Sequence, residues 1–286
     1  LRTVGNSGSE FVVPDLVAIG NTLTRLPIFG LAESEIHSVY SFGQLAYKNY
    51  LYLDFSGRND WSSTLSPKNN SFFYPSVSAS FIASDAFGIS NDALNFLKFR
   101  SSLAQAGSSG SPYQTKGTFT LGANTISGQP VGGYTNVIVS PDLKNELTTS
   151  FEAGFDAKLL NNRISLAATY YHASTKNQIL DVPLPTSTSF STMRLNAGNI
   201  QNQGIEISLS GSPISTKSGF RWDVTFNFAS NRNKVVDLYP GINTFKLGDD
   251  RNITVVAEVG KPFGTLVGTN FVWLKDANGK RLIDGI

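Results

Sequence analysis

The stretch TTSFEAGFDAKLLNNRISLAATYYHAST, residues 148–175, decides the fold that this sequence predicts. In residues 151–159 every second side chain is apolar, and the residues between them are polar, charged or glycine. The pair Asn161-Asn162 interrupts the pattern, and asparagine tolerates the positive φ angles of a tight hairpin turn. The period of two then resumes over residues 164–170. Two alternating runs on either side of a short turn predict a β-hairpin.

The length of the two arms favours a membrane location for this hairpin. Each arm is about ten to thirteen residues long, which exceeds the ~5–6 residues of a soluble strand and matches the ~9–11 of a tilted transmembrane strand. The chain has 286 residues, no cysteine and a formal net charge of +2. It has no run of eighteen apolar residues, and alternating hydropathy is typical of a transmembrane β-barrel. The lack of a basic run predicts no nucleic-acid partner.

Six further segments alternate in the same way, so we expect eight strands between residues 36 and 231. The alternation in 36–47 does not define which of its side chains share a face. The expected strands are 36–47, 50–60, 74–84, 96–107, the two hairpin arms, 203–211 and 220–231.

The charged residues of these strands all fall in the polar set of side chains. They include Asp54, Arg58, Lys98, Arg100, Glu152, Asp156, Lys158, Arg163, Glu206, Arg221 and Asp223. A lipid-facing surface avoids charge, because one charge there costs roughly 2–4 kcal/mol at the bilayer midplane. We therefore expect the apolar set, including Phe151, Phe155, Leu166, Phe226 and Phe228, to face outward.

The connections between the expected strands alternate in length. Those after the first, third, fifth and seventh strands are the shorter ones, and those after the even-numbered strands are longer. Outer-membrane barrels have short periplasmic turns and long extracellular loops. We therefore expect a transmembrane β-barrel segment at 36–231, with extracellular loop regions at 1–35, 108–147, 176–202 and 232–286.

Two other interpretations fit the alternation. Eight strands can close into a small outer-membrane barrel whose interior is filled by side chains, which would act as an anchor or adhesin. A soluble β-sandwich binding module also alternates, with its apolar face turned to a core. A sandwich has no reason to keep strands this long or to sort its connections by end, so the membrane barrel is favoured.

Six segments carry a family resemblance. They are YLYLDFSGRNDWSSTL (50–65), YPSVSASF (74–81), LKFRSSLAQAG (97–107), SPDLKNELTTSFEAGFDAKLLNNRISLAATYYHASTKNQI (140–179), NAGNIQNQGIEISL (196–209) and EVGKPFGTLVG (258–268). Together they resemble the SusC/RagA family of TonB-dependent outer-membrane transporters, and they occur in that family's order. The resemblance covers most of residues 36–286.

The resemblance implies an all-β, antiparallel transmembrane β-barrel of about twenty-two strands, of which this chain is an internal segment. It also implies an N-terminal plug domain and a segment that contacts the TonB complex, neither of which is present in this sequence. A SusD-like surface lipoprotein is implied as a lid over the barrel. The implied function is import of oligosaccharides or peptides across the cell outer membrane.

The sequence does not predict an enzyme or a cofactor. It has two histidines, His37 and His172, and no motif for metal, phosphate or nucleophile chemistry. Substrate contact is instead expected from charged side chains that face the lumen and from loop aromatics, which stack on sugar rings or pack against a lid. Packing within the loop is the alternative role for each aromatic. The candidates are Arg58, Arg100, Glu152, Asp156, Arg221, Asp223, Tyr113, Tyr134, Phe190 and Trp273.

Overall fold

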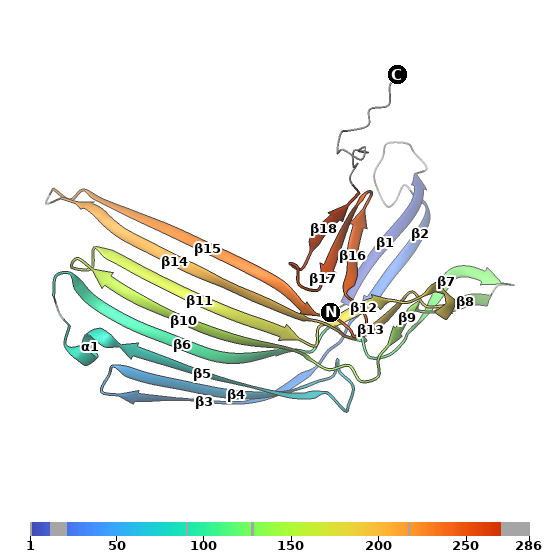
Figure 1. The fold of residues 1–286 in the computed structure, drawn as a ribbon. Helices are drawn as coiled ribbons and strands as arrows, with labels where there is room; N and C mark the ends of the chain where they lie inside the picture. Colours follow the sequence, from blue (N-terminus) through green and yellow to red (C-terminus); the bar gives the residue numbers. More distant parts are fainter. Residues whose placement is uncertain (1, 12–21, 90, 127–128, 217, 270–286) are drawn as a thin grey trace, which may run out of the picture.

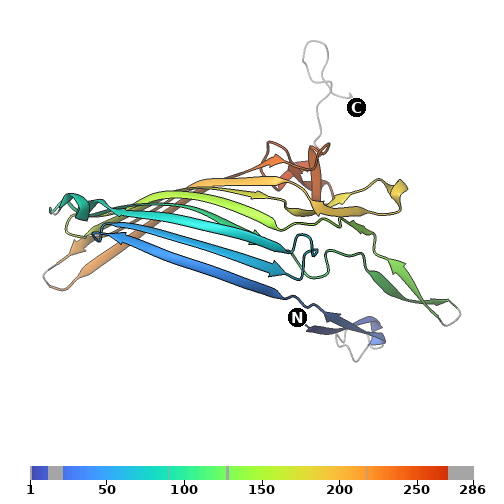
Figure 2. The same cartoon turned by 90° about the horizontal axis from the view of Figure 1, so that it is seen from below.

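The main element of the structure is one antiparallel sheet of eight strands. The computed structural model describes residues 2–11, 22–89, 91–126, 129–216 and 218–269. The strand order is β15-β14-β11-β10-β6-β5-β4-β3, and Figures 1 and 2 show the sheet as a long curved wall. Its strands are β3 (Ile36–Tyr47), β4 (Leu51–Ser62), β5 (Ser71–Ile82), β6 (Leu94–Ser108), β10 (Glu146–Leu159), β11 (Ile164–Lys176), β14 (Asn199–Ser215) and β15 (Arg221–Asp237).

All eight expected strands are confirmed, and they pair in the order in which the sequence presents them. β3 and β15 lie at opposite edges of the sheet and do not pair with each other. The closed eight-stranded barrel is therefore wrong, and so is the sandwich, because the eight strands form a single layer. The predicted fold class, a segment of an antiparallel β-barrel wall, is confirmed. No helix in the described part of the chain has the length and hydropathy needed to span a membrane.

The register of the strands divides the side chains into two faces. Directly paired residues of antiparallel strands lie on the same face, so paired residues form rows across the sheet. One row consists of Phe81, Phe99, Phe155, Ala168, Ile207 and Phe228. The adjacent row, on the other face, consists of Lys98, Asp156, Ala167, Ser208 and Asn227. We call these two faces the apolar face and the polar face.

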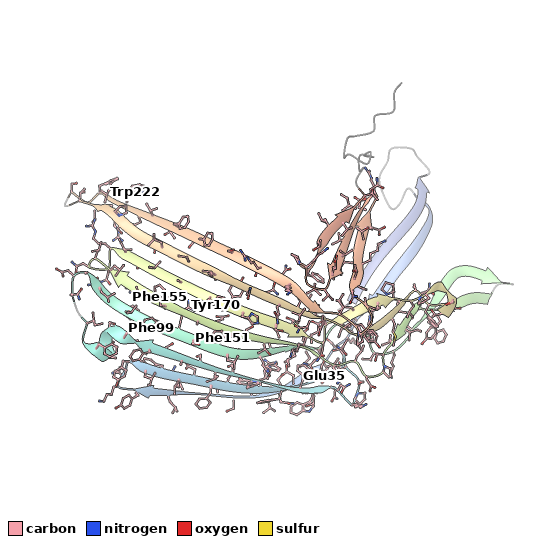
Figure 3. The ribbon with its side chains drawn as sticks, in the orientation of Figure 1. Glu35, Phe99, Phe151, Phe155, Tyr170 and Trp222 are labelled. Atoms are coloured by element: carbon pink, nitrogen blue, oxygen red, sulfur yellow. The ribbon has the colours of Figure 1, made fainter. Side chains whose placement is uncertain are left out.

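The predicted separation of charge between the faces holds over the middle of the sheet. Phe151, Phe155, Leu166, Phe226 and Phe228 share the apolar face, as predicted, and Phe226 is 58% exposed. Figure 3 shows side chains along the sheet, with Phe99, Phe151, Phe155 and Tyr170 in its middle part. A few charged residues of the eight strands have the register of the apolar face, and all of them lie at one end of the sheet. They are Lys176, Arg232, Lys234 and Asp237.

One charged residue differs from the prediction. Arg163, expected on the polar face, lies in the turn 160–163 rather than in a strand. Its Nη2 donates hydrogen bonds to the carbonyl oxygens of Ser212 and Pro213, at 3.2 and 3.1 Å. The turn extends one residue further than the sequence pattern indicates, so β11 begins at Ile164 and the Arg163 side chain bends toward the neighbouring connection.

The connections lie alternately at the two ends of the sheet. At the short-connection end are 48–50, 83–93, 160–163 and 216–220, and at the long-connection end are 63–70, 109–145 and 177–198. The predicted sorting by length is wrong for one pair, because 83–93 is longer than 63–70. The reason is the short helix α1 (Ala83–Phe87), which ends at Gly88 with a left-handed φ of 62°.

The regions predicted as loops contain additional strands. β1 (Arg2–Phe11) and β2 (Thr22–Leu31) form a hairpin within 1–35, and β16 (Thr244–Asp250), β17 (Ile253–Glu258) and β18 (Thr265–Gly268) form a sheet after β15. Short strands and a register shift between Lys246 and Gly248 obscure the period of two there. The two long connections also contain strands: β7 (Phe119–Ile126), β8 (Gln129–Tyr134), β9 (Val137–Val139), β12 (Ile179–Pro183) and β13 (Thr192–Asn196).

The hydrophobic core of the described chain lies at the long-connection end. Strands β12, β13, β16 and β17 and the end of β15 pack together, and we call this assembly the outer module. Its buried residues are Val182, Leu195, Ala197, Val235, Phe245 and Ala257. Arg194 is bound by both carboxylate oxygens of Asp181 at 2.6 Å, and these hydrogen bonds raise the pKa of the Arg194 guanidinium above its usual value. The long connections therefore form a packed structure next to the sheet.

We predict that Ala168→Arg impairs folding of the full-length protein into membranes far more than Ala167→Arg. The two alanines are adjacent in the middle of β11, but Ala168 lies opposite Phe155 on the apolar face and Ala167 lies opposite Asp156 on the polar face. A charge on the lipid face costs about 2–4 kcal/mol at the midplane. Heat-modifiable gel mobility and urea titration in liposomes measure the effect. Equal yields of folded barrel for the two variants would contradict the face assignment.

Candidate functional site

The central charges of the polar face form a network across three strands. Arg100 on β6 places its Nε 3.6 Å from Asp156 Oδ2 on β10, and its Nη2 donates a 2.6 Å hydrogen bond to Thr169 Oγ1 on β11. Lys98 Nζ lies 3.9 Å from the same carboxylate oxygen. These side chains are about one third exposed, so the network is both positioned and open to a ligand.

Gly154 makes room for this network. A Cβ atom added at Gly154 would lie 3.3 Å from Arg100 Cζ and 2.6 Å from the Ala168 carbonyl oxygen. A larger residue would therefore displace the guanidinium or the neighbouring strand. Glycine at this position allows the Arg100 side chain to extend across β10 to β11.

Glu152 and Arg100 line a common hollow of about 160 Å³ with serines of β5 and β6. Arg100 also borders a second hollow, of about 380 Å³, with Thr169 and Glu206. The structure thus brings together three of the predicted candidates: Arg100, Glu152 and Asp156. Their shared setting is a polar wall with hydroxyl groups and charges of both signs, which can form hydrogen bonds with a hydrated polar ligand.

The fourth predicted lumen residue on this side of the sheet, Arg58, has a separate setting. Its Nε donates to Asp60 Oδ1 at 2.7 Å and its Nη2 donates to Ser38 Oγ at 2.9 Å. Tyr74 OH donates to the other oxygen of Asp60. The Asp60 side chain is 7% exposed and that of Arg58 is 47% exposed, so a buried carboxylate fixes the orientation of an accessible arginine.

Aromatic rings surround Arg58 on the same face. Tyr40 and Tyr74 are its direct partners on the two neighbouring strands. Tyr40 stacks with Phe42 at 6.4 Å between ring centroids, and Phe72 stacks with Tyr74 at 5.9 Å. We call Arg58, Asp60 and these four rings the arginine–aromatic cluster.

Sequence reasoning missed the rings of the arginine–aromatic cluster for two reasons. The phase of 36–47 was ambiguous, because Tyr40 and Phe42 occupy the polar face of β3 while Ser41 and Gly43 occupy its apolar face. The expected strand 74–84 also leaves out Phe72, although β5 begins at Ser71. The signal that identifies them is the cross-strand row Tyr40–Arg58–Tyr74, which requires the register.

Arg221 and Asp223 lie apart from these groups, on β15 at the opposite edge of the sheet. Arg221 Nε is 2.8 Å from Asp223 Oδ1, and its Nη2 donates to Ser212 Oγ at 2.9 Å. Both side chains are at least 60% exposed. The structure therefore does not bring this pair into contact with Arg58 or Arg100.

Two of the predicted loop aromatics, one from each of the two longest connections, come together. The rings of Tyr134 and Phe190 meet edge to face at 6.1 Å, and Phe119 packs on Tyr134 at 4.9 Å. We call these three residues the loop aromatic patch. Tyr113 lies elsewhere and its hydroxyl oxygen accepts a hydrogen bond from the Glu33 N–H at 3.1 Å. Trp273 lies outside the described residues.

Nothing in the described residues resembles a metal centre. No group of three or more histidine, aspartate or glutamate side chains is placed to hold an ion in this part of the chain. The geometry available for function is therefore the polar face, with its central network and its arginine–aromatic cluster, and the loop aromatic patch.

Comparison with known proteins identifies relatives of the whole wall. A family model described as TonB dependent receptor-like, beta-barrel matches residues 7–276. The TonB-dependent receptor P26 of Formosa agariphila is 34% identical over 202 residues, which are 69% of this chain and 20% of that protein. The TonB-dependent receptor SusC of Bacteroides thetaiotaomicron is 37% identical over 101 residues, or 35% of this chain and 10% of that protein.

Solved structures give the same picture. The structure of the RagAB peptide transporter matches with a TM-score of 0.77 and 26% identity, covering 91% of this chain and 29% of that chain. The RagAB peptide importer in the 'open-open' state matches with a TM-score of 0.73 and 28% identity, covering 85% of this chain and 26% of that chain. This chain spans about a fifth of the length of the curated TonB-dependent receptor P26.

We predict that the two partners of the Arg58–Asp60 pair are unequal in their effect on stability. Arg58→Met leaves a buried carboxylate with Tyr74 as its remaining strong donor, which should cost about 2–3 kcal/mol. Asp60→Asn leaves an arginine that water can reach, and should cost less than about 1 kcal/mol. Urea titration of the full-length barrel, followed by tryptophan fluorescence, compares them.

The double variant Arg58→Met/Asp60→Asn is the control for this asymmetry. It removes the buried charge together with its partner, so we expect it to be more stable than Arg58→Met alone. If the single variants cost the same, the carboxylate is not held by Arg58 in the way that the geometry indicates.

Proposed function

The chain belongs to the TonB-dependent receptor-like β-barrel family, and from this premise we propose that it forms eight adjacent wall strands of a cell outer-membrane importer. The apolar face contacts lipid and the polar face lines the lumen. The short connections face the periplasm, and the long connections with the outer module face the outside. The observation that carries this proposal is the separation of charge between two faces of one open, curved sheet.

The cargo in this proposal is an oligosaccharide or a peptide. The polar face offers charges of both signs, serine hydroxyls and exposed aromatic rings, a combination that suits a hydrated ligand with rings or small apolar groups. The similarity to a structure described as a peptide transporter supports the peptide alternative. The loop aromatic patch supports the oligosaccharide alternative, because aromatic rings are suited to stacking on sugar rings.

Within the lumen, we assign substrate contact to Arg58, Arg100, Glu152 and Asp156. Arg221 and Asp223 line the same wall near the periplasmic end, where cargo would leave. Exposed ion pairs contribute little to binding energy, so their role is to hydrogen-bond passing cargo rather than to retain it.

The partners in this proposal are a SusD-like lipoprotein outside and the TonB complex inside. The TonB complex would act through a segment that this sequence does not contain. The lipoprotein would close over the outer module and the loop aromatic patch. Aromatic side chains commonly dominate such contacts, because they bury a large area at little cost in conformational entropy.

We predict that removing the tip of the first long connection uncouples the lid and leaves the barrel folded. Thr118 and Thr135 are joined by a 3.0 Å backbone hydrogen bond, so residues 119–134 can be replaced by Asn-Gly without separating this neck. The deletion removes Phe119 and Tyr134 from the loop aromatic patch. We expect roughly tenfold weaker association with the lipoprotein and slower growth on the cognate nutrient.

The control for this deletion is Tyr113→Phe, which removes a loop hydroxyl outside the patch. It should leave co-purification with the lipoprotein and growth unchanged. If the deletion variant binds the lipoprotein and supports growth as the unaltered protein does, the loop aromatic patch has no part in lid contact.

A further inference from the structure

The apolar face has a hollow at the short-connection end, around Gly211. The hollow measures about 390 Å³. Gly211 on β14 pairs with Ile164 on β11 and with Val224 on β15, so a row of apolar side chains is interrupted by a residue without one. The register then shifts between Gly211 and Ile214, which leaves Ser212 and Pro213 outside the pairing.

Apolar side chains form the walls of the hollow. Leu209 and Phe226 form the next pair beside Gly211 on the apolar face, and Leu160 lines the hollow on the side of the turn 160–163. Described strands flank the hollow on both sides, since β11 and β15 lie on either side of β14. A neighbouring strand of a complete barrel would pair with the far edge of β15 and would not cover Gly211. The hollow therefore remains open on the lipid-facing surface.

A cation lies at the rim of this hollow. Arg163 is exposed and lines it, and its Nη2 is held by the carbonyl oxygens of Ser212 and Pro213. Guanidinium has five N–H donors, so these contacts fix the group and leave donors available. Among the described residues, Arg163 forms no ion pair.

The position of the hollow relative to the bilayer is indicated by Trp222. Trp222 pairs with Ile214 on the apolar face, at the end of the sheet beyond Val224, and Figure 3 shows it at that end. Tryptophan on a lipid-facing surface is enriched at the level of the headgroups. The apolar hollow thus lies just inside the headgroup level, and Arg163 lies close to the headgroup level.

We propose that this site binds one phospholipid, with an acyl chain in the hollow around Gly211 and the headgroup phosphate at Arg163. Arginine binds phosphate by paired, charge-assisted hydrogen bonds, and the fixed guanidinium is pre-oriented for this contact. The occupant follows from the location, because the hollow is continuous with a surface that hydrocarbon covers. The inference rests on the proposed function for its orientation, which places the site in the periplasmic leaflet, where the outer membrane contains phospholipids.

The test uses the full-length receptor in phosphatidylethanolamine vesicles that contain phosphatidylglycerol with a photoreactive diazirine on its acyl chain. After irradiation, mass spectrometry maps the adducts to peptides. We expect adducts to concentrate on peptides that contain residues 160–166 and 209–226. Arg163→Gln should lower this yield roughly tenfold, the loss expected for a charge-assisted phosphate contact. Gly211→Leu, which fills the hollow, should lower it at least as much.

Two control variants separate this site from the general surface. Lys48→Gln removes a cation from another turn at the same end of the sheet, and Ala79→Leu adds a leucine to the apolar face on β5. Neither should change the adducts at the site. A Cβ at Gly211 would lie 3.2 Å from the Arg163 carbonyl oxygen, so if Gly211→Leu does not fold, Arg163→Gln decides the result.

The possible outcomes distinguish this inference from the proposed function. Adducts spread evenly over the apolar face, or unchanged in Arg163→Gln, overturn the phospholipid site while a folded, transporting receptor retains the proposed function. A protein that shows no heat-modifiable barrel in vesicles overturns the membrane orientation itself. The phospholipid site is established if adducts form there, if Arg163→Gln and Gly211→Leu both lower their yield, and if both control variants leave the yield unchanged.

Discussion

The structure depends on the hydrogen-bonded register between neighbouring strands. In hydrocarbon every backbone N–H and C=O must have a partner, so the ladder of a lipid-facing sheet has to be continuous through its middle, and its register shifts lie toward the ends of the strands. The pairing of β10 with β11 runs without a shift from Leu147 to Leu159, and β3 with β4 is equally regular. A slip of one residue would exchange the two faces and place Asp156 in lipid. The charge pattern of the sequence and the ladder of the backbone therefore select the same register.

The regular part of this arrangement is readable from the sequence, because a period of two reports directly on which side chains share a face. The hairpin around Asn161-Asn162 fixes the phase of two strands, and the exclusion of charge fixes the phase of most others. Strand β3 was the exception, since Tyr40 and Phe42 place large rings on the polar face. The arginine–aromatic cluster was missed for the same reason: its rings belong together only through pairing across three strands.

The outer module could not be predicted from periodicity, because its contacts join distant parts of the chain. Strand β13 pairs in parallel with β9, and the core joins Val182 to Phe245 and Ala257. Each strand is short, so no local run is long enough to show a period. The sequence shows where the regular wall stops, and long-range packing decides what the remaining residues form.

The location of the buried core explains what stabilises the two parts of the chain. The outer module buries apolar side chains against one another, as a soluble domain does. The wall leaves residues such as Phe55, Phe99 and Phe226 about half exposed on its apolar face. In water this surface would favour association, while in a bilayer it is solvated by acyl chains. Among the described strands, β3 and β15 also have one neighbour each. Lipid and further strand partners are therefore required for the wall to be stable. Acyl chains must also pack against the lipid-facing surface, including the gap at Gly211, as closely as side chains pack in a protein interior.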